Sequence, residues 1–315
     1  AQHKDRKGMV ALFRGVIFQL NRRLHLYLQN ESARGENETW RPAVVCVSTD
    51  SLQRDNALNL MSWISHKYGF GTFIHLFKGY YSRKTKDQAE DIKNVLLERS
   101  TSRKGQIYID TLISPSYTSA IAQVIQLPAV TGKENNMVIF DFDKSNPVNL
   151  HQITDNFNLV AAADCDVCVL GCSQVANPSR KRRNIHIWIQ KSDPDNANLM
   201  ILLGYVISAH PYWKKSKISI FDVCDPATVD EERQYLEELL KSGRLPITAR
   251  NIKVIEKDQE RNIRSIMAEY SKDADLTVMG FRSDQVKHEG DETFLGFDGV
   301  GEILFVNSRA AKNIE

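Results

Sequence analysis

Short runs of β-branched and aromatic residues alternate with helical patterns along most of this 315-residue chain, and the same order of elements occurs twice. Each predicted strand of the second half follows its counterpart by about 140 residues, which indicates a tandem duplication of one fold. Strands that alternate with helices in this way predict an α/β fold with a mainly parallel sheet. The predicted strands are Ala43–Ser48, Gly71–Phe77, Gln106–Leu112, Met137–Phe142 and Val167–Leu170 in the first half, and Ile185–Ile189, Lys217–Val223, Asn251–Glu256, Leu276–Phe281 and Glu302–Val306 in the second.

Four amphipathic patterns separate the strands of the first half and predict helices. They are Arg54–Tyr68, Thr85–Ser100, Ser116–Leu127 and Val148–Ala162. We therefore predict two tandem α/β subdomains, residues 41–176 and residues 185–315, each with a mainly parallel five-stranded sheet flanked by helices. Residues 177–184 between them carry a proline and a basic run, which is typical of an exposed linker.

Residues 1–40 are predicted to form an amphipathic helix and a polar linker. Apolar residues recur there at helical spacing, with Arg14, Arg22 and Arg23 between them. Two interpretations stay open: the helix packs its apolar stripe on the following domain, or it is a juxtamembrane connector near anionic lipid headgroups. The basic run Arg180–Arg183 is interpreted either as a solvated linker or as a contact for acidic lipid or a membrane domain.

Charge and cysteine content exclude some classes of protein. A net charge of +2 disfavours a nucleic-acid partner. The five cysteines are an odd number and most lie in apolar strand-like runs, which favours a reducing cytosol. No apolar run reaches the roughly 18 to 20 residues that a membrane-spanning helix needs, and the start carries no signal-peptide pattern. We expect a soluble domain that forms no transport path by itself.

Metal-binding and catalytic patterns are weak. Cys165, Cys168 and Cys172 suggest a metal site, but Cys165 and Cys168 would point to opposite faces of the predicted strand. The histidines are dispersed, and none belongs to a nucleophile elbow or a His-Glu-x-x-His motif. We therefore predict no catalytic, cofactor-binding or metal-binding residues, no cofactor and no enzyme activity.

Five segments in one order carry a family resemblance. They are Trp40-Arg-Pro42, Thr131–Phe140, Val148–Val169, Ile185–Ile220 and Ile263–Val278. Together they resemble the cytosolic C-terminal domain of a prokaryotic cation-chloride cotransporter, of the Na-K-Cl and K-Cl family, although Met137 stands where threonine is usual.

The resemblance implies a non-catalytic regulatory and dimerisation domain. It implies that the chain pairs with itself as a homodimer and lies on the cytoplasmic side of the cell membrane. Its other implied partner is the transmembrane domain of the same polypeptide, which would precede it and couple Na⁺ or K⁺ movement to Cl⁻. Anionic lipid headgroups near the N-terminal helix are a further expected contact.

Each half also resembles the universal stress protein fold, which makes an ATP-binding module the alternative function. Ligands of open parallel sheets bind at the carboxyl ends of the strands, where six aspartates are found in this sequence. Turn and helix-cap roles are the favoured interpretation of these aspartates. They are Asp50, Asp141 and Asp143 in the first half, and Asp193, Asp222 and Asp225 in the second.

Glycine placement argues against a phosphate site in the second half. A phosphate-binding loop offers free N–H groups from a glycine-rich turn at a helix start. Phe281 and Arg282 follow Gly280, so the second glycine of the stress-protein pattern is missing. The segment Gly296–Gly301 is glycine-rich but has Asp298 at its centre, and we predict a flexible loop there. Nucleotide binding stays open for the first half.

Overall fold

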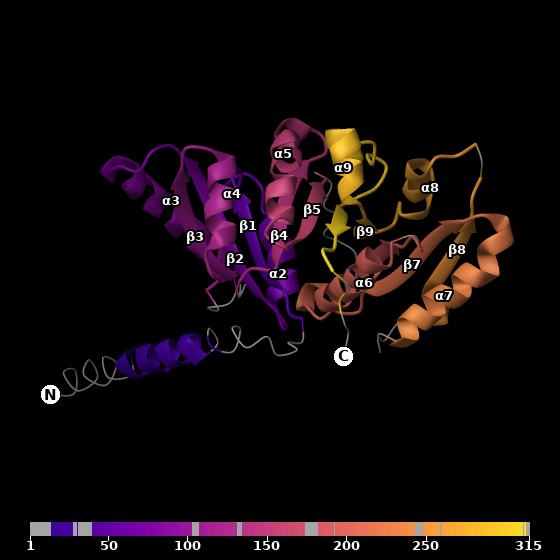
Figure 1. Ribbon diagram of the computed structural model, residues 1–315, viewed down its shortest axis with the longest axis horizontal. Helices are drawn as coiled ribbons and strands as arrows, with labels where there is room; N and C mark the ends of the chain where they lie inside the picture. The colour runs from indigo at the N-terminus through magenta and orange to yellow at the C-terminus, as the bar shows by residue number, and fades with distance from the viewer. Residues whose placement is uncertain are drawn as a thin grey trace.

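The computed structural model contains one sheet of ten strands, in the order β3-β2-β1-β4-β5-β10-β9-β6-β7-β8. It describes residues 14–27, 30, 40–102, 107–130, 134–173, 182–191, 193–242, 248–258, 260–310 and 312. Most of the predicted linker at 177–184 therefore lies outside the described residues. The subdomain boundaries stay a prediction, and the two predicted five-stranded sheets are joined into a single one (Figure 1).

The two halves repeat the same succession of elements. Strand order around the first and sixth strands is also the same, since β1 lies between β2 and β4, and β6 lies between β7 and β9. The elements of the first half are β1 (Ala43–Ser48), α2 (Asn56–Ser65), β2 (Phe70–Lys78), α3 (Arg83–Ser102), β3 (Ile107–Ser114), α4 (Tyr117–Gln126), β4 (Met137–Asp143), α5 (Leu150–Ala161) and β5 (Asp166–Cys172). Those of the second half are β6 (Asn184–Trp188), α6 (Pro194–Ser208), β7 (Lys217–Cys224), α7 (Val229–Ser242), β8 (Ile252–Glu256), α8 (Ile263–Tyr270), β9 (Leu276–Gly280), α9 (Ser283–Glu289) and β10 (Ile303–Asn307). The predicted α/β fold, with all ten strands, is confirmed.

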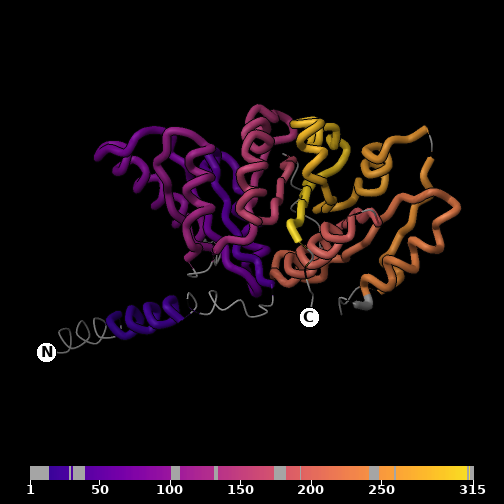
Figure 2. The backbone as a smooth tube through the Cα atoms, viewed as in Figure 1, coloured from indigo at the N-terminus to yellow at the C-terminus, as the bar shows by residue number. Residues whose placement is uncertain are grey.

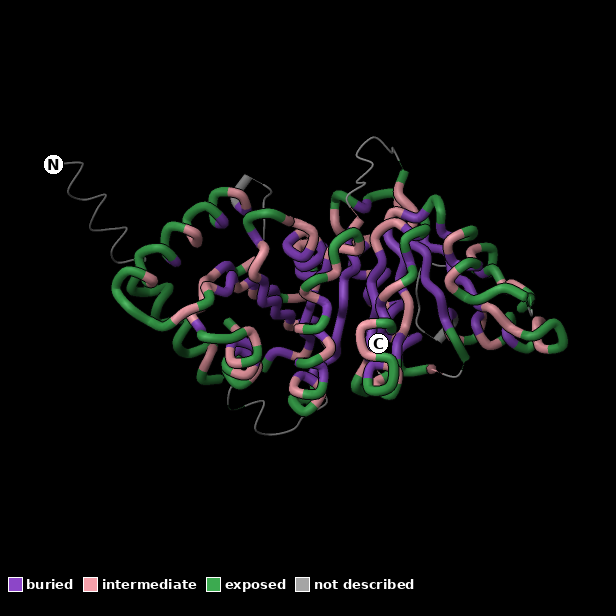
Figure 3. Tube along the Cα trace, turned by 90° about the horizontal axis from the view of Figure 1, so that it is seen from above, coloured by how far each residue is buried: buried purple, intermediate pink, exposed green. Residues whose placement is uncertain are grey.

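Helices cover both faces of the sheet. One apolar core joins α2, α3, α6 and α7 to the first face, and a second core joins α4, α5, α8 and α9 to the other. β-Branched and aromatic residues suit strands that are packed on both sides, which explains why the strand signals were continuous apolar runs. Figure 3 shows the buried strands between layers of helices whose outer sides are exposed.

The halves meet at a seam where β5 pairs with β10. This pairing is antiparallel, with Val169 opposite Phe305, whereas every other strand pair in the sheet is parallel. Figure 2 traces the last strand of the chain alongside the middle of the molecule, between the two halves. Because the strands reverse at the seam, the carboxyl ends of the two halves lie on opposite edges of the sheet.

Contacts on both faces reinforce the seam. On one face α2 packs against α6, and Trp63 stacks on Tyr212 with ring centroids 5.3 Å apart. On the other face Phe157 of α5 packs against Phe281 with ring centroids 5.6 Å apart, and the Thr154 hydroxyl donates a hydrogen bond to the Asp291 carboxylate at 2.6 Å. Equivalent helices of the two repeats meet across the first face, as they would across a two-fold interface between separate subunits.

The N-terminal helix is described over residues 14–27. Its apolar side chains point into solvent: Val16 is 64% exposed, Ile17 61% and Leu20 57%. Figure 1 shows this helix apart from the sheet and its covering helices. The interpretation in which the stripe packs on the following domain is therefore wrong for these residues. Among the described residues, no helix combines the length and the hydrophobicity that crossing a bilayer requires.

Candidate functional site

The topology creates two comparable crevices. In each half the strand order reverses at one strand, which is β1 in the first half and β6 in the second. The connection after β1 leads to β2 on one side and the connection after β4 leads to β5 on the other side, so the two connections diverge. The connections after β6 and β9 diverge in the same way. Open α/β sheets bind ligands at such switch points, outside the carboxyl ends of the strands. The two crevices open on opposite edges of the sheet, because the halves run in opposite directions.

Side chains fill the crevice of the first half. Arg54 lies 3.1 Å from Asp50 and 3.3 Å from Asp141, and Asn149 donates to Asp50 at 2.9 Å. Burial raises the pKa of Asp141, and the Arg54 guanidinium opposes that rise. The remaining cavity is about 20 Å³, which is space for about one water molecule. This crevice between β1 and β4, in the half for which the sequence leaves nucleotide binding open, therefore has no room for a nucleotide in this arrangement.

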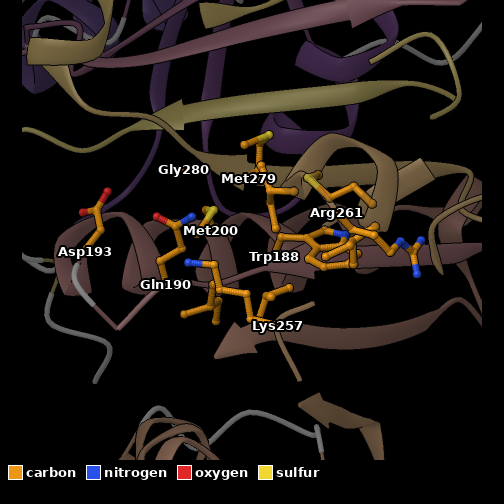
Figure 4. A pocket seen from close by; sticks show the side chains of 13 residues that line it. Trp188, Gln190, Asp193, Met200, Lys257, Arg261, Met279 and Gly280 are labelled. Carbon is orange, nitrogen blue, oxygen red and sulfur yellow. The ribbon is translucent and has the colours of Figure 1, made fainter. Parts of the chain in front are cut away.

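The crevice of the second half is open, with a cavity of about 230 Å³ (Figure 4). Its floor consists of buried side chains from β6, α6 and α8, including Trp188, Met200 and Met267. Polar groups stand around the floor. They are Gln190 and Asp193 after β6, and Lys257 and Arg261 between β8 and α8.

The charged residues at this crevice differ in how far they are already paired. Asp193 caps α6, because its carboxylate accepts hydrogen bonds from the backbone and the side chain of Asn196. Burial raises the pKa of Asp193, and these hydrogen bonds oppose the rise. Arg261 forms an ion pair with Glu269 on α8. Among the ion pairs of the described residues, none includes Lys257.

The turn from β9 to α9 is already hydrogen-bonded within the chain. The Arg282 backbone N–H, at the cap of α9, donates to the Gln285 side chain at 2.8 Å. The Phe281 N–H donates to Val306 at 3.0 Å, and the Phe281 carbonyl accepts from Asn307 at 2.9 Å. These donors are not available to a phosphate, which agrees with the missing second glycine in the sequence.

The glycine-rich segment Gly296–Gly301 is held in place, which corrects the predicted flexible loop. Lys144 from the first half donates to the carbonyls of Phe297 at 3.2 Å, Gly301 at 2.6 Å and Val300. Phe297 and Val300 are also buried in the core. The ammonium has three donors, and three carbonyls converge on it, so this contact links the halves beside the seam.

The remaining predicted aspartates have local or buried surroundings. Asp143 accepts from the Ser145 backbone at 2.8 Å and fixes a turn, whereas Asp225 makes no side-chain cap. Asp222 is buried beside Glu232, and burial together with this second carboxyl raises its pKa to about 6. Lys191 lies 3.3 Å from Glu232. Sequence reasoning missed this carboxyl pair, because ten residues and a turn separate its members.

The three cysteines in and just before β5 lie on opposite faces of the sheet, as strand alternation predicts. Cys165 belongs to one core, and Cys168 and Cys172 belong to the other. Burial raises the pKa of Cys165 to about 11, which keeps its thiol protonated at neutral pH. Within the part of the chain that the structure describes, no three His, Cys, Asp or Glu side chains are arranged to hold a metal ion.

Comparisons with known proteins agree on one fold. No protein-family model matches the chain. The crystal structure of the cytoplasmic domain of a prokaryotic cation chloride cotransporter superposes with a TM-score of 0.56 and 13% identity, over 87% of this chain and 98% of that one. A putative universal stress protein from Pseudomonas aeruginosa gives a TM-score of 0.53 and 16% identity, over 84% and 92%.

One curated protein is similar in sequence. Potassium/chloride cotransporter 3 of Caenorhabditis elegans is 22% identical over 208 residues, which is 62% of this chain and 19% of that protein. The chain thus spans about a fifth of that relative's length. The structural comparison and the sequence comparison both confirm the resemblance to the cation-chloride cotransporters that the sequence motifs indicate. This chain has the fold of the cytoplasmic domain of a prokaryotic cation chloride cotransporter, built from two stress-protein-like halves.

Proposed function

We propose that the chain is the cytosolic regulatory and dimerisation domain of a cation-chloride cotransporter. In this role it lies on the cytoplasmic side of the membrane, is non-catalytic, and supports coupled Na⁺, K⁺ and Cl⁻ transport by a membrane domain of the same polypeptide. The observation that carries the proposal is the similarity in fold to such a domain over 87% of this chain and 98% of the other. The partial identity to a potassium/chloride cotransporter supports it from the sequence side.

Dimerisation is tested by sedimentation at several concentrations of the whole chain. We expect the weight-average mass to rise from that of one 35.9 kDa chain toward twice that value. A strict monomer up to hundreds of micromolar would remove the dimerisation role. The gene offers a separate test of the transport assignment: the reading frame before Ala1 should encode about ten to twelve apolar helices, each about 20 residues long.

The helix at 14–27 supports a lipid contact close to the membrane. Its apolar side chains are exposed, and Arg22 and Arg23 lie among them. Exposed apolar area next to basic side chains is the composition of helices that bind anionic interfaces. We expect the chain to co-sediment with vesicles that contain phosphatidylserine more than with pure phosphatidylcholine. Replacing both arginines with glutamine should abolish the difference, and unchanged binding would rule out the lipid contact.

The alternative function, a stress-type ATP-binding module, rests on the fold and on the open crevice of the second half. Two observations weigh against it: side chains fill the first-half crevice, and the N–H groups of Phe281 and Arg282 in the turn from β9 to α9 already have acceptors within the chain. Calorimetric titration with ATP and Mg²⁺ decides between the two functions. The proposed function predicts no micromolar binding, and a micromolar dissociation constant would favour the nucleotide module.

A further inference from the structure

The crevice between β6 and β9 has the size of a small aromatic ring system. Its 230 Å³ is about one and a half times the roughly 150 Å³ apolar cavity that is known to accept benzene. A fused bicyclic ring fits this space, and a larger group would have to extend into solvent. The floor offers flat and adaptable surfaces, namely the indole of Trp188 and the thioethers of Met200, Met267 and Met279. Sulfur and ring edges contact aromatic ligands favourably.

The floor is rigid before any ligand arrives. The Trp188 indole N–H donates to Ser271 at 2.9 Å, and the ring stacks on Phe221 with centroids 4.8 Å apart. Ser271 is itself fully buried. A ring that is fixed on one face by stacking and at its edge by a hydrogen bond does not need to reorganise when a ligand covers the other face. Such preorganisation lowers the entropic cost of binding.

One end of the crevice is suited to a single negative charge. Figure 4 shows Lys257 extending toward Gln190, with Asp193 beyond Gln190 on the same side of the view; the Asp193 carboxylate is engaged as a helix cap. Lys257 belongs to no ion pair among the described residues, while Arg261 is held by Glu269. An ammonium and a neighbouring amide can bind one carboxylate or a group of similar charge.

The same surroundings disfavour a polyphosphate. A triphosphate needs several N–H donors or a metal ion in addition to one lysine. The Arg282 N–H that could contribute is bound to Gln285, and Asp193 adds negative charge on that side. We propose that the crevice between β6 and β9 is a binding site for a small aromatic acid, with the ring on the Trp188 and methionine floor and its single anionic group at Lys257. This site goes beyond the proposed assembly role and does not depend on it.

Calorimetric titration of the whole chain tests the site with three probes. Indole-3-acetate has a bicyclic ring and one carboxylate, tryptamine has the same ring with a positive charge, and ATP with Mg²⁺ has a ring and a polyphosphate. We expect indole-3-acetate to bind at least tenfold more tightly than either of the others. Equal binding of tryptamine would overturn the anion site, and tighter binding of ATP with Mg²⁺ would replace it with a nucleotide site.

Variants locate the binding. Lys257→Gln should weaken indole-3-acetate about tenfold, and Met279→Phe, which fills the cavity, should abolish its binding. Lys217→Gln is the matched control and should leave the affinity unchanged. Lys217 is an exposed lysine at the start of β7, and the crevice lies beyond the other end of that strand. Thermal unfolding of each variant confirms that it is folded. Binding that survives both Lys257→Gln and Met279→Phe, or no binding of indole-3-acetate by the native chain at millimolar concentration, would refute the proposal.

Discussion

The buried carboxyl pair of the second half makes the stability of the chain depend on pH. Asp222 is 3% exposed, and its pKa rises from the ordinary 3.8 to about 6, first because it is buried and second because Glu232 lies beside it. The folded chain therefore binds a proton at Asp222 more tightly than the unfolded chain does. Stability falls as the pH rises through the interval from about 4 to about 6, in which only the folded chain holds the proton.

Asp222→Asn removes the loss of stability that the ionisation of Asp222 causes, because the amide is neutral at every pH. Its side-chain oxygen can still accept the hydrogen bond from the Val223 backbone, which is 2.8 Å long in the native chain. A pKa difference of about 2 units lowers the free energy of unfolding by about 3 kcal/mol at pH 7.5, where Asp222 is ionised in both the folded and the unfolded chain. We expect the variant to be more stable than the native chain by up to about 3 kcal/mol at pH 7.5, and by less than about 1 kcal/mol at pH 4.

Urea denaturation at both pH values, followed by circular dichroism, measures the difference. Asp225→Asn, an exposed aspartate just after the same strand, is the matched control and should change stability by less than about 0.5 kcal/mol at either pH. An equal gain from Asp222→Asn at pH 4 and pH 7.5 would show that packing, and not ionisation, is responsible. A loss of stability at pH 7.5 would refute the reasoning altogether.

Three further substitutions test two contacts between the halves and the ion pairs in the crevice of the first half. Lys144→Met should cost about 2 to 3 kcal/mol in urea denaturation, because it leaves three partly buried carbonyls without their charged donor. An equal stability would show that water replaces the ammonium. Arg54→Met should cost about 3 to 5 kcal/mol at pH 8, because it leaves the buried Asp141 carboxylate without its cation, and less at pH 4, because the pKa of Asp141 is raised by burial. A pH-independent cost would contradict the ion-pair role. Trp63→Ala should lower the unfolding free energy by about 3 to 5 kcal/mol, and a loss below 1 kcal/mol would mean that the contact between α2 and α6 contributes little.

The local sequence pattern was sufficient to predict the strands, but it could not predict which strands pair with each other. A continuous apolar run such as Met137–Phe142 identifies a buried strand, and the structure extends it by one residue to Asp143. The antiparallel pairing of β5 with β10 could not be predicted, because alternation along a strand carries no information about which strand lies beside it or in which direction.

The candidate site shows the same division between local and long-range information. Asp193 was correctly interpreted as a cap, since Pro194 and the helix that follows are its neighbours in sequence. The open crevice was missed, because Met200 and Met279 are indistinguishable from other core methionines until the fold places them around one cavity. Lys144 was missed as well, since its acceptors lie more than 150 residues away along the chain.

The seam has a consequence for how the chain can be divided. Separating the halves would expose the outer edges of both β5 and β10, two strands whose residues are buried throughout. Each isolated repeat would present a row of unpaired backbone groups next to an apolar surface, which is the structure from which strand-to-strand aggregation starts. We therefore expect that neither copy of the fold stays soluble when it is expressed without the other. The unit of folding, and of any motion transmitted through the domain, is the sheet that the two copies share.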